Sequence, residues 1–221
     1  MCRLRAGTDP CKAGSRKPPS GADRSDAGVD RQAPRGNGAP SMIDAAHYHA
    51  VEKLPDGQEI EIRAQRPQDR EAIRAAIARA SAESLYHRFF AVKREFSEKE
   101  VHYFLDIDFV NHVALVALAD ENGRPTIIGG CRYIVVRPGV AEISFSVIDA
   151  YQHRGVGTAL MRHIAALARK AGLKELVAEV LADNALMLKV FEESGLPMST
   201  NLSGTTVDVS LRLTREDAGP G

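Results

Sequence analysis

Seven consecutive residues have the types and spacing to bind a phosphate group. Their segment places two glycines one residue apart, where a predicted strand ends and a helical pattern begins. Backbone N–H groups can approach a phosphate closely where side chains are missing, and a helix N-terminus contributes roughly half a positive charge. One arginine adds a full charge. The residues are Gln152, His153, Arg154, Gly155, Val156, Gly157 and Thr158.

The glycine spacing excludes two common phosphate loops. The segment has no G-x-x-x-x-G-K-[ST] pattern, which a P-loop needs, and it lacks the third glycine of the dinucleotide-binding fingerprint. We therefore expect a pyrophosphate ligand of another kind.

The segment from Gln152 to Gly157 resembles the Q/R-x-x-G-x-G/A signature of the GNAT N-acetyltransferase superfamily. Asn184, with Gly195-Leu196 eleven residues beyond it, resembles a second block of that family, and the likeness covers about residues 58–213. The resemblance implies that acetyl-CoA is the co-substrate, with its pyrophosphate on residues 152–158. It also implies that backbone groups of Val147 and Ile148 orient the pantetheine arm. Asn184 would hold the cofactor or cap the adjoining helix.

Acyl transfer to an amine requires a group that removes a proton, because an unperturbed lysine amine has a pKa of about 10.4. Strand alternation between Ala141 and Ile148 puts Glu142, Ser144 and Ser146 on one face and apolar side chains on the other. A carboxylate on a central strand suggests a partly desolvated cleft, where its pKa can approach that of a useful base. We expect Glu142 to be the general base; the alternative is a solvated glutamate near a strand end.

A second block of residues resembles one particular group within this superfamily. Residues 81–90 resemble the S-x-E-S-x-Y-x-R-F-F block of bacterial protein lysine acetyltransferases of the Pat type, and Ala141-Glu142 matches the A-E block that carries their expected base. The resemblance implies that the acceptor is a protein lysine. We expect the aromatic side chains of Tyr86, Phe89 and Phe90 to pack in the core, and we assign no role to Arg88.

Two observations keep other functions open. Phe191 stands where many family members have a tyrosine that protonates the leaving thiolate, so a water or another donor would have to serve. The sequence also names no specific acceptor. A small-molecule amine remains the alternative acceptor, and a module that binds acyl-CoA with little chemistry is a third reading. No cysteine is placed beside a histidine partner, and we expect direct transfer without an acyl-enzyme.

The elements that must position these residues follow from hydrophobic periodicity. We expect a single domain over residues 43–221 with an α/β (α+β) fold of the GNAT type. It would have a mixed, mostly antiparallel central sheet that splays after the fourth strand, with helices on both faces. The expected strands are 58–64, 112–119, 126–136, 141–148, 175–181 and 205–213, and the expected helices are 67–80, 83–90, a short one capped by Ser97, 155–171 and one from Asn184 to Gly195.

Composition excludes several classes of function. The chain has 221 residues with 29 basic and 29 acidic side chains, so it lacks the positive charge of a nucleic-acid or polybasic membrane-surface binder. Three scattered cysteines fit neither a disulfide framework nor a zinc site, and we expect no metal and a cytoplasmic location. Residues 1–42 are rich in Gly, Pro and basic residues and predict a disordered tail. The sequence does not determine an oligomeric state.

Overall fold

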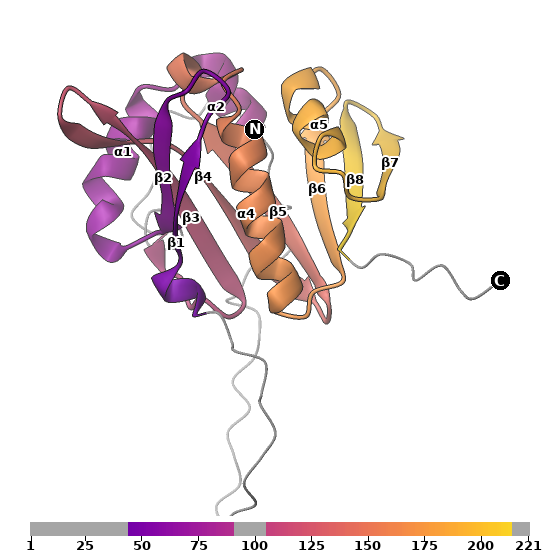
Figure 1. The fold of residues 1–221 in the computed structure, drawn as a ribbon. Coiled ribbons are helices and arrows are strands. Elements are labelled where there is room, and N and C mark those ends of the chain that lie inside the picture. Colours follow the sequence, from indigo (N-terminus) through magenta and orange to yellow (C-terminus); the bar gives the residue numbers. More distant parts are fainter. Residues whose placement is uncertain (1–43, 91–104, 214–221) are drawn as a thin grey trace, which may run out of the picture.

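The computed structural model describes residues 44–90 and 105–213. The predicted tail over residues 1–42 and the predicted helix beginning at Ser97 therefore lie outside the described residues, except for the end of that helix at Leu105. An eight-stranded sheet with the order β1-β2-β3-β4-β5-β6-β8-β7 dominates the described part (Figure 1). Its strands are β1 (His49–Lys53), β2 (Glu59–Ala64), β3 (His112–Glu121), β4 (Arg124–Arg137), β5 (Val140–Val147), β6 (Glu175–Leu181), β7 (Met198–Ser203) and β8 (Thr206–Arg212).

Helices cover both faces of the sheet, as predicted (Figure 1). The helices are α1 (Arg70–Ala78), α2 (Ala82–Phe89), α4 (Val156–Lys170) and α5 (Ala185–Glu192). The apolar stripe of α4 packs on Ile143 and Phe145 of β5 within the main core cluster. Helix α1 packs against β4 and α2 against β5, and Arg88 of α2 contacts Ser144 on the opposite face of β5. Strand β5 thus separates an apolar side from a polar one.

Among the described strands, β5 and β6 form the one parallel pair, and they separate early. They are in register only from Val140 to Glu142, opposite Glu175 to Val177. Beyond Glu142, β5 has no ladder to β6, so its outer edge is open along the rest of the strand. This confirms the predicted splay.

Two edge strands were not predicted. Strand β1 alternates exposed and half-buried residues, and β7 is exposed along most of its length, so neither has the buried apolar face that makes a strand recognisable. The first predicted helix is divided, because Pro67–Asp69 forms a 3-10 turn before α1 begins. The predicted meander of β3, β4 and β5 is confirmed; Asn122 and Gly123 both have positive φ in the first of its turns.

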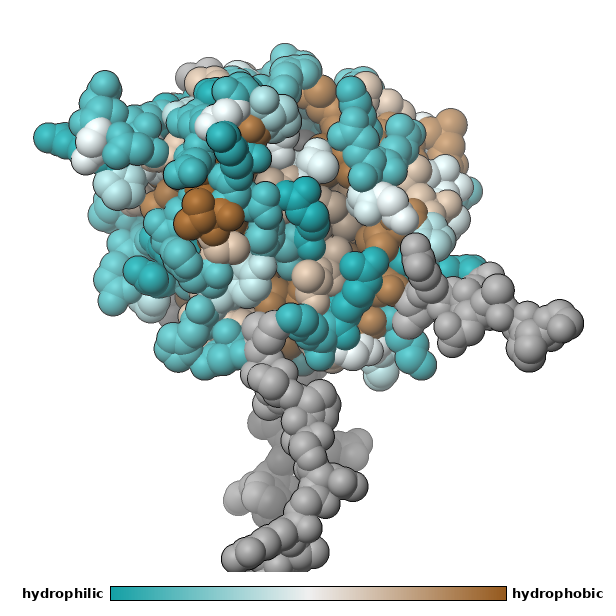
Figure 2. Space-filling view, viewed as in Figure 1, coloured by the Kyte–Doolittle hydropathy of each residue, from teal (hydrophilic) through white to brown (hydrophobic). Residues whose placement is uncertain are grey.

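The face shown in Figure 2 carries mainly hydrophilic side chains, and hydrophobic ones occur on it as separate patches. Within the described residues, no helix has the length and apolar character needed to cross a bilayer.

Candidate functional site

The loop between β5 and α4 leads directly into the N-terminus of α4. His153 and Gly155 have φ values of 60° and 88°, and this left-handed backbone turns the chain into the helix. The first intrahelical hydrogen bond runs from the N–H of Ala159 to the carbonyl of Gly155, at 2.9 Å. The preceding N–H groups at the start of α4 point out of the helix, as a helix N-terminus requires. This is the backbone arrangement that a helix N-terminus offers to an anion.

The two glycines of the loop serve different purposes. A side chain at Gly155 would require an unfavourable positive φ, and its Cβ would lie 3.0 Å from Cδ of Pro55. A Cβ at Gly157 would lie 3.2 Å from Cγ2 of Val190, so this glycine lets α5 approach α4. Glycine is needed at the first position by conformation and at the second by packing.

A cavity of about 560 Å³ opens beside this loop. It extends from the open edge of β5 past the start of α4 to the turn between β1 and β2. Seven of the predicted cofactor-binding residues line it: Val147, Gln152, His153, Gly155, Gly157, Thr158 and Asn184. The structure therefore brings most of the predicted set around one space large enough for an extended ligand.

Three predicted residues lie elsewhere. Val156 is 1% exposed and Ile148 is 4% exposed, and both side chains belong to the core. Ile148 also uses its N–H to bond the carbonyl of Ile128 on β4, at 3.0 Å. Since successive residues of a strand direct their backbone groups to opposite sides, the backbone groups of Val147 point to the open edge.

Arg154 contacts the β1–β2 turn and is not among the residues that line the cavity. Its Nε donates to the carboxylate of Asp56 at 2.8 Å, its Nη2 donates to Oε1 of Gln58, and its guanidinium lies 4.7 Å from the ring centroid of Tyr151. The arginine holds this turn against the loop. Its partners are almost 100 residues away, which is why the motif alone did not reveal this role.

Asn184 caps α5 and also lies at the wall of the larger cavity. Its side chain is 3% exposed, and Oδ1 accepts a hydrogen bond from the N–H of Met187 at 3.2 Å, which caps α5. The residue also lines the cavity. Capping thus fixes the asparagine at the cavity wall.

Glu142 lies at the last position where β5 and β6 are paired, opposite Val177 on β6. The residue is 3% exposed, so the alternative of a solvated glutamate is wrong. Ser144, on the same face, is also buried, and Ser146 is half-buried. The predicted polar face therefore exists within the covered part of the sheet.

A second cavity, of about 120 Å³, lies between this polar face and helices α1 and α2. Its walls are mostly apolar, with Arg88, Arg132 and Ser144 among its polar residues. Phe145 and Val147 line both cavities. The two cavities therefore share a wall at the end of β5.

Arg132 is a residue that sequence reasoning missed. It pairs in register with Ser144, and its Nη1 lies 3.2 Å from Nε2 of His112. Burial, and then the charge of Arg132, lower the pKa of His112 to about 4, and Nδ1 of the histidine lies 3.1 Å from the carbonyl of Asp106. A neutral ring that donates from Nδ1 and accepts at Nε2 satisfies both contacts. The sequence feature that could have pointed to Arg132 is its position as a lone arginine within an apolar strand.

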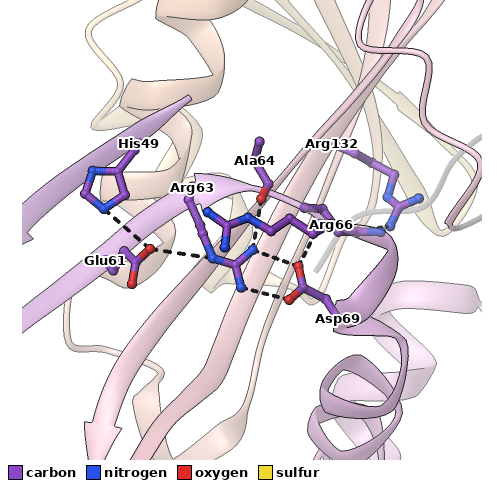
Figure 3. A network of polar contacts seen from close by, with 8 residues as sticks. His49, Glu61, Arg63, Ala64, Arg66, Asp69 and Arg132 are labelled. Carbon is purple, nitrogen blue, oxygen red and sulfur yellow. Dashed lines mark hydrogen bonds and ion pairs between the residues drawn. The ribbon is translucent and has the colours of Figure 1, made fainter. Parts of the chain in front are cut away.

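A buried ion pair supports this face from β2 (Figure 3). Both nitrogens of the Arg63 fork donate to the Asp69 carboxylate at 2.8 Å, and the backbone N–H of Arg66 donates to the same carboxylate at 2.7 Å. Figure 3 shows Arg132, which lies on β4, beside this network. The pair fastens the start of α1 to the sheet.

The aromatic residues divide between core and surface. Phe191 is fully buried and meets Phe145 edge-on, with 6.0 Å between ring centroids. Phe89 and Phe90 are half-buried, whereas Tyr86 is 41% exposed. The expectation that Tyr86 packs in the core is wrong, because it points away from the sheet side of α2.

Within the described residues, no group of three His, Cys, Asp or Glu side chains could hold a metal ion.

Comparisons with known proteins agree on the kind of domain. The family model described as "Acetyltransferase (GNAT) family" matches residues 70–196. Acetyltransferase PA5475 of Pseudomonas aeruginosa is 34% identical over 140 residues, which cover 63% of this chain and 75% of that protein. Acetyltransferase Pat of Mycolicibacterium smegmatis is 33% identical over 119 residues, which cover 52% of this chain and 34% of that protein. The chain thus spans about a third of the length of this second relative.

Solved structures show the same fold. The GNAT domain of S. lividans PAT is 35% identical, with a TM-score of 0.68 that covers 74% of this chain and 96% of that one. The yncA protein of Salmonella typhimurium, solved with its cofactor acetyl-CoA, is 19% identical, with a TM-score of 0.56 that covers 73% of this chain and 98% of that one. The second likeness concerns the fold alone.

Proposed function

The chain belongs to the GNAT acetyltransferase family, and on that premise we propose that it transfers acetyl from acetyl-CoA directly to the side-chain amine of a protein lysine. The observation that carries the choice of acceptor concerns α2. The segment that resembles the Pat block forms this helix, which borders both cavities and contacts β5 two residues from Glu142. Two relatives that are named Pat or PAT support the same choice.

The residues present fit acetyl-CoA. The N–H groups at the start of α4, with His153, Gly155 and Gly157, face the larger cavity and suit a pyrophosphate. The open edge of β5 beyond Glu142 offers backbone groups, the N–H of Val147 among them, that suit the amides of a pantetheine arm. Asn184 completes the cavity wall. When bound, acetyl-CoA supplies an activated thioester.

The chain itself supplies proton transfer. An acceptor lysine must lose a proton before it can attack, and Glu142, buried where β5 and β6 separate, is the carboxylate that we assign to this step. Cys131 does not compete as a nucleophile. Burial raises the pKa of its thiol, which lies inside the core against the carbonyl of Leu160. These contacts support direct transfer rather than an acyl-enzyme at this cysteine.

A small-molecule amine is the alternative acceptor. The observation that favours it is the small second cavity, in which Arg88 and Arg132 could pair with the carboxylate of an amino-acid-like substrate. The third reading, a binding module with little activity, has its support in Phe191, which has no hydroxyl to donate.

The proposed cytoplasmic location can be tested separately, by cell fractionation.

Thiol release from acetyl-CoA tests these readings with one assay. Purified protein is incubated with lysine-containing peptides, amino acids and polyamines, and free CoA is measured over time. Release with peptides supports the proposed function, whereas release with small amines alone supports the alternative. Tight binding of CoA without release in any mixture would support the binding module.

A further inference from the structure

Gln152 is the first residue of the phosphate-binding motif, yet all its N–H groups are already used. Its backbone N–H donates to the carbonyl of Asp149 at 3.2 Å. Its Nε2 carries two hydrogens and donates to Oγ of Ser84 at 2.9 Å and to the carbonyl of Val147 at 3.1 Å. The remaining polar atoms of Gln152 are oxygens, which accept hydrogen bonds as phosphate oxygens do. The side chain therefore has no donor left for a pyrophosphate.

Ser84 links Gln152 to Asp149 through a second hydrogen bond. Its hydroxyl accepts from Gln152 and donates to Oδ1 of Asp149 at 3.0 Å. The same carboxylate accepts from the backbone N–H of Ser81 at 2.8 Å and from its hydroxyl at 2.6 Å. Burial alone would raise the pKa of Asp149, but the hydrogen bonds from Ser81 and Ser84 hold it below its ordinary value. The first turn of α2 is thus fastened to the cofactor loop by a carboxylate that stays ionised near neutral pH.

Helix α2 forms a wall of both cavities. Ser84 and His87 line the larger one, and Leu85, Arg88 and Phe89 line the smaller one. At its far end, Arg88 donates to Ser144 on β5 at 3.0 Å. The helix is therefore held at two places, by Arg88 on β5 and by Ser81 and Ser84 on Asp149 at the loop. Gln152 adds to the second contact through Ser84.

We propose that Gln152 and Ser84 are positioning residues that hold the acceptor-side helix α2 against the cofactor loop, and that the Gln152 side chain is not a ligand of the cofactor phosphates. This inference rests on the proposed function for the identity of the two cavities. Gln152 and Ser84 set the position of α2, and so the shape of the acceptor cavity. The N–H groups of residues 153–158 bind the pyrophosphate without the Gln152 amide.

The test uses the full chain with Gln152→Ala, Ser84→Ala and the double substitution. Isothermal titration with CoA is expected to give dissociation constants within about twofold of the unmodified protein, because no phosphate contact is lost. Backbone amides in residues 85–89 are expected to exchange with solvent about tenfold faster in each single variant. The double variant should exchange no faster than Ser84→Ala alone, since that change already removes the acceptor of the Gln152 amide on α2. With an acceptor in hand, its KM should rise while that of acetyl-CoA stays unchanged.

Gln58→Ala is the matched control, because Gln58 contacts Arg154 on the other side of the loop and does not contact α2. It should leave amide exchange in α2 unchanged. The proposal is overturned if Gln152→Ala weakens CoA binding by about tenfold or more, the loss expected for a charge-assisted hydrogen bond, while exchange in α2 is unaffected. Exchange in the free protein needs neither cofactor nor acceptor, so a failure to find acetyl transfer would count against the proposed function alone.

Discussion

Nη2 of Arg88 donates a hydrogen bond to Oγ of Ser144 across 3.0 Å. Both residues are buried, and Ser144 lies two positions from Glu142 on the same face of β5. This contact joins the Pat-like segment to the strand that carries the proposed base. It gives Arg88 a definite place that its sequence context did not provide.

Replacement of Arg88 by methionine should destabilise the protein by about 1–3 kcal/mol, because the buried hydroxyl of Ser144 loses its donor. Urea unfolding followed by circular dichroism measures this difference. Ser144→Ala serves as the comparison and should also destabilise the protein, since it removes this acceptor from the buried guanidinium of Arg88. Equal stability of Arg88→Met and the unmodified protein would show that the contact contributes nothing.

The Arg63–Asp69 pair should be a large single contributor to stability. Asp69→Asn removes the bidentate counter-charge of a buried guanidinium and leaves it the half-buried Glu61 carboxylate, 3.5 Å from its Nε. We expect a loss of about 3 kcal/mol in the free energy of unfolding. The double substitution Arg63→Met with Asp69→Leu removes both charges and should recover most of that loss. A single variant as stable as the unmodified protein would contradict the role assigned to this network.

His112 should make stability depend on pH in a mildly acidic range. Its folded pKa is lowered from 6.5 to about 4, so between these values the unfolded chain binds a proton that the folded protein does not. Its contribution to stability is therefore present above pH 6.5 and is lost as the pH falls toward 4, at about 1.4 kcal/mol per pH unit.

His112→Gln tests this dependence, because glutamine can still accept from Arg132 but does not titrate. Free energies of unfolding, measured at intervals between pH 7 and pH 4, should fall less steeply for the variant. Identical slopes would mean that His112 takes up its proton over the same pH range in the folded and the unfolded protein.

Gly155→Ala should weaken CoA binding and stability together. The site requires a φ of 88°, which costs an alanine about 1–2 kcal/mol, and the new Cβ would meet Pro55 at 3.0 Å. Gly123→Ala is a matched control, because Gly123 has a φ of 77° in the β3–β4 turn and an added Cβ would meet no atom within 4 Å. Both variants should lose stability in thermal melts, but titration calorimetry should show weaker CoA binding for Gly155→Ala alone. Equal affinities in the two variants would separate this loop from the cofactor.

The features that could be predicted from sequence are those that local chemistry determines. Alternation identified β5 and its polar face, and the glycine pair identified the turn into α4. Glu142 was found because an acidic residue interrupts an otherwise covered strand. Each of these signals lies within about ten residues of the chain.

The features that sequence could not predict depend on distant contacts. Arg154 has the charge of a phosphate ligand, but its position is decided by Asp56, on a turn that approaches only in the folded protein. The sequence is equally ambiguous for Gln152. Its amide could donate to a phosphate, but it donates to Ser84 of α2, which is far away in the sequence. Strands β1 and β7 escaped notice because edge strands bury little apolar surface.

Mass spectrometry of acetylated lysines tests the central claim most directly. The purified protein and Glu142→Gln are each incubated with isotopically labelled acetyl-CoA and a cell lysate, and CoA affinity is measured for both to show that the substitution spares the cofactor site. We expect labelled protein lysines with the unmodified protein and a loss of about 100-fold or more in their rate of formation with Glu142→Gln, the range typical of a general base. Equal labelling by the two proteins would contradict the role of Glu142, and an absence of labelled lysines despite acetyl transfer to small amines would contradict the proposed acceptor.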